Sequence, residues 1–403
     1  MKKLLLVISL LSSFQANCQV RPKVDQLVIE AMDSLRVTGL SLGIVKDGEI
    51  LYSKGYGLTS VNTHDSITSD SYFLTASISK LFTATAIMQL AEQGKVKIDT
   101  KLIKYLPNFE MKDERFKDIT LYHLLTHSSG LKWDHVLKNS PDDSTALGLY
   151  PESFKKEKLK FAPGEKFDGT TYSNAGYDLL GSVIEKVSGL TFDEYIQKNI
   201  LLPLNMYNST YTQDTIPKEL KALPQVLSGK SKEIQRFNLY GTIKDQNPVL
   251  KYPKNPMIEY DRYGSGQEHN PSGNLISSSH DLTLWMLNLL ELYSGSNNVN
   301  QNILSRNTLA NMWSLHESIE GKKTSIGLGW WKYPDEEFGE YVFHVGREPG
   351  FCSTLMSFPE TNFGIVILCN GKQADQLVWN ELPFKIMRLL KDEEKQLTKP
   401  KKH

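Results

Sequence analysis

The chain has 403 residues with 46 basic and 46 acidic side chains, so its formal net charge is zero. It lacks the basic excess of a nucleic-acid-binding protein, and we expect no nucleic-acid partner. Apolar residues make up 40% of the chain, which suffices for the core of two or three domains or of one unit with two lobes.

The N-terminus has the pattern of a secretory signal. A basic start precedes an apolar run over residues 4–14, too short to span a bilayer, and a small-x-small cleavage pattern ends at Cys18. We expect residues 1–18 to be removed and the mature chain, without a transmembrane segment, to be periplasmic or secreted. Lipidation of Cys18 is the alternative, although Asn17 and Gln15 fit a lipobox poorly.

Helical spacing, cap residues and turn dipeptides predict the elements of the first half of the chain. An Asp-Gly pair indicates a hairpin, and Thr191 with Glu194 indicates a capping box. In order, we expect a helix over 24–37, strands over 40–45 and 50–56, a helix that opens at Ser77 and stops at Gly94, and helices over 120–126, 175–187 and 191–199.

Residues 208–271 are polar, rich in Pro, Gly, Lys and Asn, and without periodicity, which predicts long loops or an insertion of the kind that forms lids. The next residues, Ser272-Gly273-Asn274, indicate a turn. Beyond them we expect helices over 279–292 and 306–315, strands over 325–332, 340–345, 351–358 and 363–368, a helix over 373–390, and a disordered charged tail over 391–403.

This distribution of elements predicts an α+β fold. Strands near both chain ends suggest one antiparallel sheet, and the helices between them suggest a lobe of their own. We expect one domain over 19–390, with a sheet lobe from 22–70 and 320–390 and a helical lobe from 71–319. The helix that begins at Ser77 would lie where the lobes meet.

The strongest chemical signal is Ser77 followed three residues later by Lys80. Lys80 is the only formally charged side chain between Ser71 and Ala91, in a helix that is apolar nearly all round. Positions i and i+3 share a helix face, so the hydroxyl and the amine should meet. Burial lowers the pKa of a lysine toward that of a useful base. The pair is a candidate nucleophile and base; a lysine that snorkels from a core helix is the alternative.

Two later patterns complete a candidate site. Tyr172-x-Asn174 is the only Tyr-x-Asn in the chain and precedes a predicted helix. A phenol near a cationic lysine ionises more easily, which makes Tyr172 a candidate proton shuttle, and Asn174 offers an amide to a substrate carbonyl or to Lys80. His344-Val345-Gly346 ends a predicted strand, where a glycine lets a substrate backbone lie close.

In their order and separation, these patterns resemble the motifs of the serine β-lactamase and penicillin-binding superfamily, in its class C β-lactamase-like branch. The similarity covers residues 25–390 and implies a β-lactamase/transpeptidase-like fold and a serine hydrolase that needs no cofactor. The resemblance implies roles for the following groups: Ser77 as acylated nucleophile, Lys80 as base, Tyr172 as proton shuttle, Asn174 as substrate-positioning amide, His344 and Gly346 as third motif, and the backbone N–H groups of Ser77 and Arg347 as oxyanion hole.

The third motif departs from the Lys-Thr/Ser-Gly of true β-lactamases, which holds a substrate carboxylate. Here Val345 has no hydroxyl, and His344 is at best partly charged at neutral pH. His-x-Gly is similar to the esterase and D-aminopeptidase members, so we expect an exported hydrolase of small-molecule or peptide esters or amides. The alternatives are a penicillin-binding DD-carboxypeptidase, a weak β-lactamase, and a sensor that acylates without turnover.

Two other side-chain pairs raise the possibility of a metal site and of a disulfide. His123 and His127 lie four apart, but no glutamate beside them completes a zinc-protease pattern, so we expect packing histidines and no metal. Cys352 and Cys369 flank a four-residue turn and face each other if that turn is symmetric. An oxidising compartment would permit a bridge, although its cross-strand geometry is strained; two buried thiols are the alternative.

Overall fold

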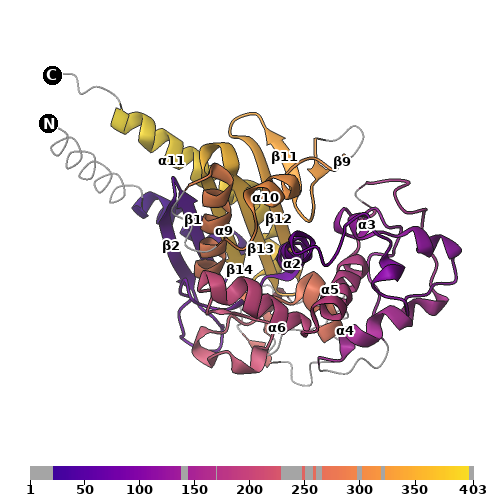
Figure 1. Cartoon of the computed structure of the whole chain (residues 1–403). Helices are drawn as coiled ribbons and strands as arrows, with labels where there is room; N and C mark the ends of the chain where they lie inside the picture. The colour runs from indigo at the N-terminus through magenta and orange to yellow at the C-terminus, as the bar shows by residue number, and fades with distance from the viewer. Residues whose placement is uncertain are drawn as a thin grey trace, which may run out of the picture.

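The computed structural model describes residues 21–137, 144–168, 170–227, 247–249, 257–259, 266–296, 302–318 and 323–398, so the expected signal segment lies outside the described residues. They form an eight-stranded antiparallel sheet with helices on both faces, beside a mainly helical lobe (Figure 1). The strand order is β2-β1-β14-β13-β12-β11-β10-β9, so strands from both chain ends pair directly. The expected α+β fold is confirmed.

The strands of this sheet follow the predicted pattern except for the short edge strand β9, which was not predicted, and the segment over 325–332. The first hairpin turns at Asp47 and Gly48, which both have positive φ, 52° and 81°, as an Asp-Gly turn between twisted strands requires. The strands are β1 (Gly39–Lys46), β2 (Glu49–Gly57), β9 (Glu317–Ser318), β10 (Ser325–Ile326), β11 (Trp331–Asp335), β12 (Gly339–Glu348), β13 (Phe351–Phe358) and β14 (Phe363–Cys369).

The second exception is the single strand expected over 325–332, which is a hairpin of β10 and β11. Gly327 donates its N–H to the Trp330 carbonyl at 2.8 Å, and Gly329 has a φ of 88°. An added Cβ on Gly327 would lie 2.1 Å from the Met312 carbonyl oxygen. The chain therefore turns where two glycines permit it, and the prediction of one strand was wrong.

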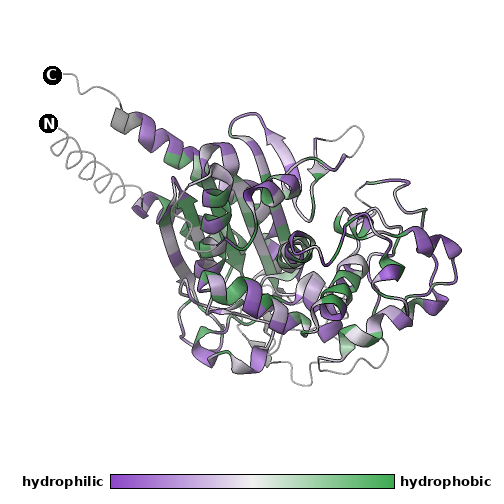
Figure 2. Ribbon diagram, in the orientation of Figure 1, coloured by the Kyte–Doolittle hydropathy of each residue, from purple (hydrophilic) through white to green (hydrophobic). Residues whose placement is uncertain are grey.

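Apolar layers cover both faces of the sheet, whose central strands are the most hydrophobic part of the molecule in Figure 2. One face packs against the helix over 21–35 and α11 through residues such as Val28 and Ile386. The other face packs against α9, which contacts β1 and β14. Trp285 of α9 stacks on Phe82 of α2 with ring centroids 4.4 Å apart. This contact joins the sheet to the helical lobe.

Helices account for most of the middle of the chain, and Thr191 and Glu194 form the predicted capping box at the start of α6. α5 and α9 end at glycines with positive φ, Gly189 and Gly295. The α-helices are α2 (Ser79–Glu92), α3 (Leu121–Leu125), α4 (Ala146–Leu149), α5 (Asn174–Ser188), α6 (Phe192–Ile196), α8 (Asn270–Gly273), α9 (Ser279–Ser294), α10 (Arg306–Met312) and α11 (Leu382–Thr398).

The region expected to form loops over 208–271 contains short strands where it is described. It contributes β4 to a small antiparallel sheet ordered β3-β8-β4, whose other two strands lie outside the region, and all three strands of a second sheet ordered β5-β7-β6. Backbone pairing thus gives this segment an order that its polar, aperiodic sequence did not predict. The strands are β3 (Phe73–Leu74), β4 (Ser209–Thr210), β5 (Gln225–Leu227), β6 (Asn247–Val249), β7 (Met257–Glu259) and β8 (Ile276–Ser277).

The C-terminal helix differs from the prediction at both ends. It begins as a π-helical turn over Leu377–Glu381 and continues as α11 to Thr398. Glu393, only 6% exposed, pairs with Lys23 of the helix over 21–35. The expected disorder from residue 391 is therefore wrong as far as Thr398, because ion pairs and packing hold this part of the helix.

The predicted register of the two cysteines is confirmed. Cys352 and Cys369 are direct partners in the β13–β14 ladder. Both are free and buried, and each thiol donates to the Gly371 carbonyl, at 3.3 and 3.5 Å. The structure therefore has two buried thiols, as in the alternative interpretation, and no disulfide bridge between them.

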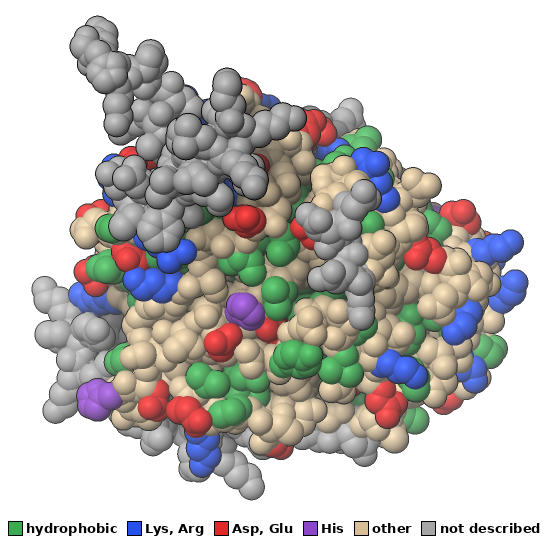
Figure 3. Space-filling model, turned by 60° about the vertical axis from the view of Figure 1, so that its left-hand side comes forward, with side chains coloured by type: hydrophobic (Ala, Val, Ile, Leu, Met, Phe, Trp, Pro, Cys, Tyr) green, Lys and Arg blue, Asp and Glu red, His purple; other side chains and the backbone are tan. Residues whose placement is uncertain are grey.

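The described surface fits the balanced composition. On the face shown in Figure 3, basic and acidic side chains are interspersed among neutral and hydrophobic ones. Every helix within the described ranges is too short or too polar to cross a bilayer.

Candidate active site

Ser77 lies in a 3-10 turn, η1 (Ala76–Ile78), directly before α2. The predicted helix start at Ser77 is thus displaced: Ala76 has a left-handed φ of 51°, and α2 begins two residues after Ser77. Such backbone costs about 1–2 kcal/mol for a residue with a side chain and is typical of functional sites. Between Ser71 and Leu90, Ser77 alone is not buried.

Lys80 meets Ser77 as the spacing predicts. Its Nζ lies 3.2 Å from Ser77 Oγ and donates to the Ser272 backbone carbonyl at 2.6 Å. The side chain is fully buried, and burial lowers the pKa of Lys80 from its ordinary 10.5 to about 7. Nearby carboxylates, of which Asp178 acts most strongly, oppose this by raising the pKa. A large fraction of Lys80 is therefore neutral at pH 7 and able to accept a proton.

Tyr172 packs against the same amine, but it does not ionise easily. Lys80 Nζ lies 4.9 Å from the Tyr172 ring centroid. Burial raises the pKa of Tyr172, although its hydrogen bond with Ser77 acts in the opposite direction. The expectation that the phenol would ionise more easily was wrong, because desolvation outweighs the hydrogen bond with Ser77. Tyr172 therefore holds its proton.

Aromatic rings fix the orientation of Tyr172. Its ring centroid lies 4.2 Å from that of His127 and 5.1 Å from that of Trp133. His127 Nδ1 accepts the N–H of Ser173 at 3.1 Å, and burial holds its pKa well below the ordinary value, so the imidazole is neutral. Since rings surround it closely, Tyr172 has little freedom to leave Ser77.

Asn174 begins α5 beside this cluster. Ser173 caps the helix by accepting the N–H of Gly176 at 3.1 Å, and Asn174 donates its own N–H to the Trp133 carbonyl at 2.6 Å. The Asn174 Oδ1 is buried and has no hydrogen-bond partner among the described residues. A buried oxygen left unpaired costs free energy, so a donor from a bound molecule would stabilise it.

His344 and Gly346 lie on the face of β12 that meets η1. A Cβ on Gly346 would stand 2.1 Å from the Thr75 carbonyl oxygen and 2.2 Å from Ser353 Oγ, so only glycine fits this contact. His344 is buried, and burial together with Lys80 lowers its pKa to about 3. Its Nδ1–H donates to the Val345 carbonyl at 2.8 Å. His344 therefore contributes no positive charge at neutral pH.

Arg347 directs its side chain to the other face of the sheet. Its guanidinium pairs with Asp375 at 3.2 Å and lies 5.9 Å from the Trp379 ring centroid. The guanidinium is thus outside the site, and only the backbone N–H of Arg347 remains a candidate substrate contact.

The segment around Ser272, predicted only to form a turn, takes part in the site. Ser272 supplies the carbonyl that holds Lys80. Its neighbours bond the start of α2: the Pro271 carbonyl accepts from Thr83 Oγ1 at 2.7 Å, and the Leu275 N–H donates to Ser79 Oγ at 2.8 Å. The buried hydroxyls of α2 were the available signal, because each needs a partner.

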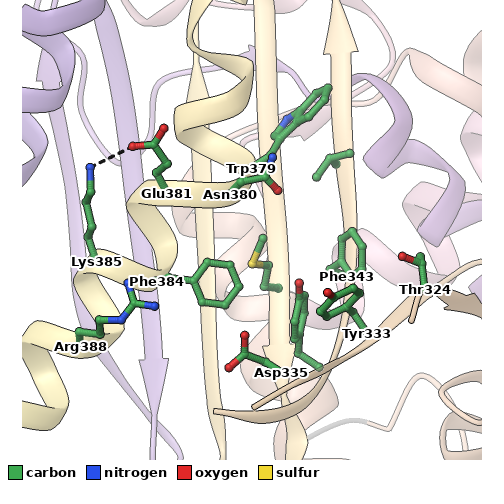
Figure 4. A pocket seen from close by; sticks show the side chains of 13 residues that line it. Thr324, Tyr333, Asp335, Phe343, Trp379, Asn380, Glu381, Phe384, Lys385 and Arg388 are labelled. Atoms are coloured by element: carbon green, nitrogen blue, oxygen red, sulfur yellow. Dashed lines mark hydrogen bonds and ion pairs between the residues drawn. The ribbon is translucent and has the colours of Figure 1, made fainter. Parts of the chain in front are cut away.

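The groove drawn in Figure 4, with a volume of about 580 Å³, lies on the opposite face of the sheet. It is lined by aromatic rings such as Tyr341 and Phe343 and by charged groups of both signs, including Asp335 and Arg388. Of the third motif only Val345 reaches it, because residues alternate between the two faces of a strand. Although this groove is large, it lies away from Ser77 and is not the candidate active site.

The two histidines considered as metal ligands have structural roles. His123 Nδ1 accepts the Thr120 N–H at 3.2 Å, which completes the capping box of α3, and His127 packs on Tyr172. Within the described ranges, no group of three or more His, Cys, Asp or Glu side chains is placed to hold a metal ion.

Comparison with known proteins identifies the family of this chain. The model of the beta-lactamase family matches residues 24–385. The chain belongs to the beta-lactamase family. Its similarity to proteins named as penicillin-binding is consistent with the serine β-lactamase and penicillin-binding superfamily.

Two curated relatives show how far the similarity extends. Protein flp from Staphylococcus aureus strain MRSA252 is 26% identical over 355 residues, covering 86% of this chain and 62% of that protein. Penicillin-binding protein 4 from Amycolatopsis lactamdurans is 29% identical over 195 residues, covering 47% of this chain and 49% of the relative. The beta-lactamase-family chain spans less than two thirds of the length of both.

Solved structures share the fold. The octameric penicillin-binding protein homologue from Pyrococcus abyssi has a TM-score of 0.69 and 26% identity, covering 93% of this chain and 78% of that one. The penicillin binding protein from Bacillus halodurans has a TM-score of 0.67 and 23% identity, covering 89% and 99%. Both are similar to this beta-lactamase-family chain in its sheet and its helical lobe together.

Proposed function

We propose that the chain is a serine hydrolase that forms an acyl-enzyme on Ser77 and hydrolyses an ester or an amide. The observation that carries the proposal is the buried Lys80 amine, with a pKa of about 7, lying 3.2 Å from Ser77 Oγ. An amine that is neutral near working pH is suited to general-base catalysis. A snorkelling lysine would instead bring its charged end to solvent.

In the proposed acylation, Lys80 Nζ takes the proton of Ser77 while Oγ attacks the substrate carbonyl carbon. The backbone N–H groups of Ser77 and Arg347 bind the oxyanion, and one such donor is worth about 3 kcal/mol in the transition state. Tyr172, which burial keeps protonated, passes its proton to the leaving alkoxide or amine and regains one from Lys80. In deacylation, a water molecule attacks the ester, and Ser77 regains its proton through the same groups.

Substrate preference follows from the uncharged third motif. His344, with a pKa of about 3, offers no cation to a carboxylate, and the Val345 side chain lies on the opposite face of the sheet. Asn174 offers its unpaired Oδ1 to a substrate N–H. These features favour an esterase or D-amino-acid amidase over an efficient β-lactamase.

A second candidate is a penicillin-binding DD-carboxypeptidase or a protein that acylates without turnover. Its support is the similarity to proteins named as penicillin-binding. A fluorophosphonate, which stays on a reactive serine, tests whether Ser77 is activated, and a fluorescent penicillin followed over time together with an ester assay separates the candidates. Ester turnover identifies a hydrolase, and a persistent penicillin adduct without ester turnover identifies a sensor. An unlabelled wild-type protein, or labelling that persists in Ser77→Ala, would contradict both.

The same preparation tests specificity. We expect p-nitrophenyl esters or D-amino acid anilides to be hydrolysed faster than nitrocefin. The variant His344→Lys should modestly raise affinity for carboxylate-bearing β-lactams, with wild type as its control. If wild type hydrolyses nitrocefin faster than any simple ester, the argument from the third motif fails.

Export is part of the proposal and rests on the signal pattern over residues 1–18. Mass spectrometry of protein from the periplasm or medium should find Gln19 as the first residue. An intact N-terminus in the cytoplasmic fraction would contradict this, and a lipid on Cys18 would support the lipoprotein alternative.

A further inference from the structure

A buried ion pair lies next to Lys80, outside the three sequence motifs. His269 Nδ1 is 2.8 Å from Asp178 Oδ2, and the two side chains are 7% and 0% exposed. Asp178 belongs to α5, and His269 ends the 3-10 turn η9 (Gln267–His269) that leads directly into α8. The proposed mechanism makes no use of either residue.

The pair joins two segments that meet at Lys80. Ser272, three residues after His269, accepts from Lys80 Nζ through its carbonyl at 2.6 Å. The Ser272 side chain also favours the charged form of Asp178. Gly181, one turn after Asp178 on α5, has no room for a Cβ beside Pro271, where the nearest atom would be 2.1 Å away. The short helix α8, which is the single turn Asn270–Gly273, is therefore anchored to α5 at one end and holds Lys80 at the other.

We propose that Asp178 and His269 are positioning residues: their ion pair fixes the turn Asn270–Gly273 on α5, so that the Ser272 carbonyl holds the Lys80 amine beside Ser77 Oγ. The inference rests on the proposed function in so far as Lys80 is the base. One hydrogen bond at 2.6 Å to a carbonyl that is itself held rigidly restricts the amine to the side of Ser77.

The charges around Lys80 give the pair a second effect. Three carboxylates favour the charged form of Lys80, in the order Asp178, Glu348 and Asp134. The two imidazoles that face it, His127 and His344, are neutral because burial and Lys80 itself lower their pKa. Asp178 is therefore the strongest single influence that keeps the pKa of Lys80 from falling further.

His269 moderates that influence. Burial alone would remove its proton, but Asp178, Asp134 and Glu268 outweigh burial and raise the pKa of His269 to about 9. Tyr150 and His135 also face this cluster, as neutral groups: burial raises the pKa of Tyr150 and lowers that of His135. Burial raises the pKa of Asp178, and His269 and Ser272 oppose this by favouring the carboxylate. His269 thus helps to keep Asp178 charged, and at Lys80 the carboxylate acts more strongly than the imidazolium.

The test compares Asp178→Asn with His269→Gln. Asp178→Asn removes the carboxylate, so the acid limb of the ester kcat/KM profile should move to lower pH by about 1 unit. His269→Gln leaves the carboxylate uncompensated, so the limb should move to higher pH. Both variants should lose about tenfold or more in kcat, because the lysine is less well placed. A merely structural role would lower activity without moving the limb.

A second readout needs no substrate. The ¹³Cε resonance of Lys80, assigned by its loss in Lys80→Arg, should titrate near pH 7 and shift in the same directions in the two variants. If Ser77 is never acylated, the proposed function fails while this titration still tests the ion pair.

A control and a rescue complete the design. Asp281→Asn removes another buried carboxylate, which accepts from Asn208 and Ser209, and should leave the limb in place. The double variant Asp178→Asn/His269→Gln keeps a neutral hydrogen-bonded pair, so it should fold even where a single variant does not. The acid limb of its kcat/KM profile should lie at lower pH than that of wild type. Wild-type limbs and wild-type Lys80 titration in the folded variants would overturn the proposal.

Discussion

Replacing Lys80 with methionine should stabilise the fold at neutral pH while abolishing hydrolysis. Burial lowers the pKa of Lys80 from 10.5 to about 7. At about 1.4 kcal/mol per pH unit, keeping this lysine protonated in the folded chain lowers the free energy of unfolding by about 5 kcal/mol. Methionine fills most of the same space without the charge. It leaves the Ser272 carbonyl, which accepts from Nζ at 2.6 Å, without a donor, at a cost of about 1–3 kcal/mol. The net gain should be about 2–4 kcal/mol.

The dependence on pH distinguishes this cause from better packing. Because the folded pKa of Lys80 lies below its unfolded value, the unfolded chain binds more protons between pH 7 and 10.5. Wild-type stability therefore gains from this group as pH rises through that window. The variant lacks the group, so its advantage should shrink between pH 7 and 10.

Denaturant unfolding of both proteins at pH 7, 8.5 and 10 measures the effect. Lys101→Met, at an exposed lysine paired with Asp118, is the matched control and should show little change. An advantage for Lys80→Met that is the same at every pH, or a loss of stability at pH 7, would refute the reasoning.

Three further outcomes are expected. Ser77→Ala and Tyr172→Phe should each lower ester turnover by roughly 10³-fold or more and combine non-additively in initial-rate assays; full activity in Ser77→Ala would end the mechanism. Gly346→Ala should cost about 1–3 kcal/mol in denaturant unfolding, because its Cβ would stand 2.1 Å from the Thr75 carbonyl; unchanged stability would show that β12 shifts freely. Cys352 and Cys369 should titrate as two thiols with Ellman's reagent after unfolding of protein from an oxidising compartment; a count near zero would indicate a bridge.

Features that depend on neighbouring residues could be predicted from the sequence. The turn at Asp47 and Gly48 needs two residues with positive φ, and the Asp-Gly pair supplies them. Cys352 faces Cys369 because the turn between β13 and β14 is short and symmetric. The meeting of Ser77 with Lys80 follows in the same way from helical spacing. Each of these results depends on backbone geometry over a few residues.

Where several long-range contacts compete, the sequence pattern was insufficient. Residues 325–332 have the composition of one strand, but the close approach of Gly327 to the Met312 carbonyl bends the chain into a hairpin. The charged residues after 390 suggest disorder, yet Glu393 is buried against Lys23, which lies 370 positions earlier. A charged side chain is ordered when its partner is already held in place, and a local pattern does not contain that partner.

The chemistry of the site divides in the same way. The sequence determined that a serine lies one turn from a buried lysine, because spacing and apolar neighbours are local properties. Only the tertiary structure decided that Tyr172 keeps its proton, since desolvation depends on every ring packed around it. It also brought the carbonyl of Ser272 to Lys80 across 192 positions of sequence. Proton affinity depends on the complete surroundings of a group, and those surroundings exist only once the chain has folded.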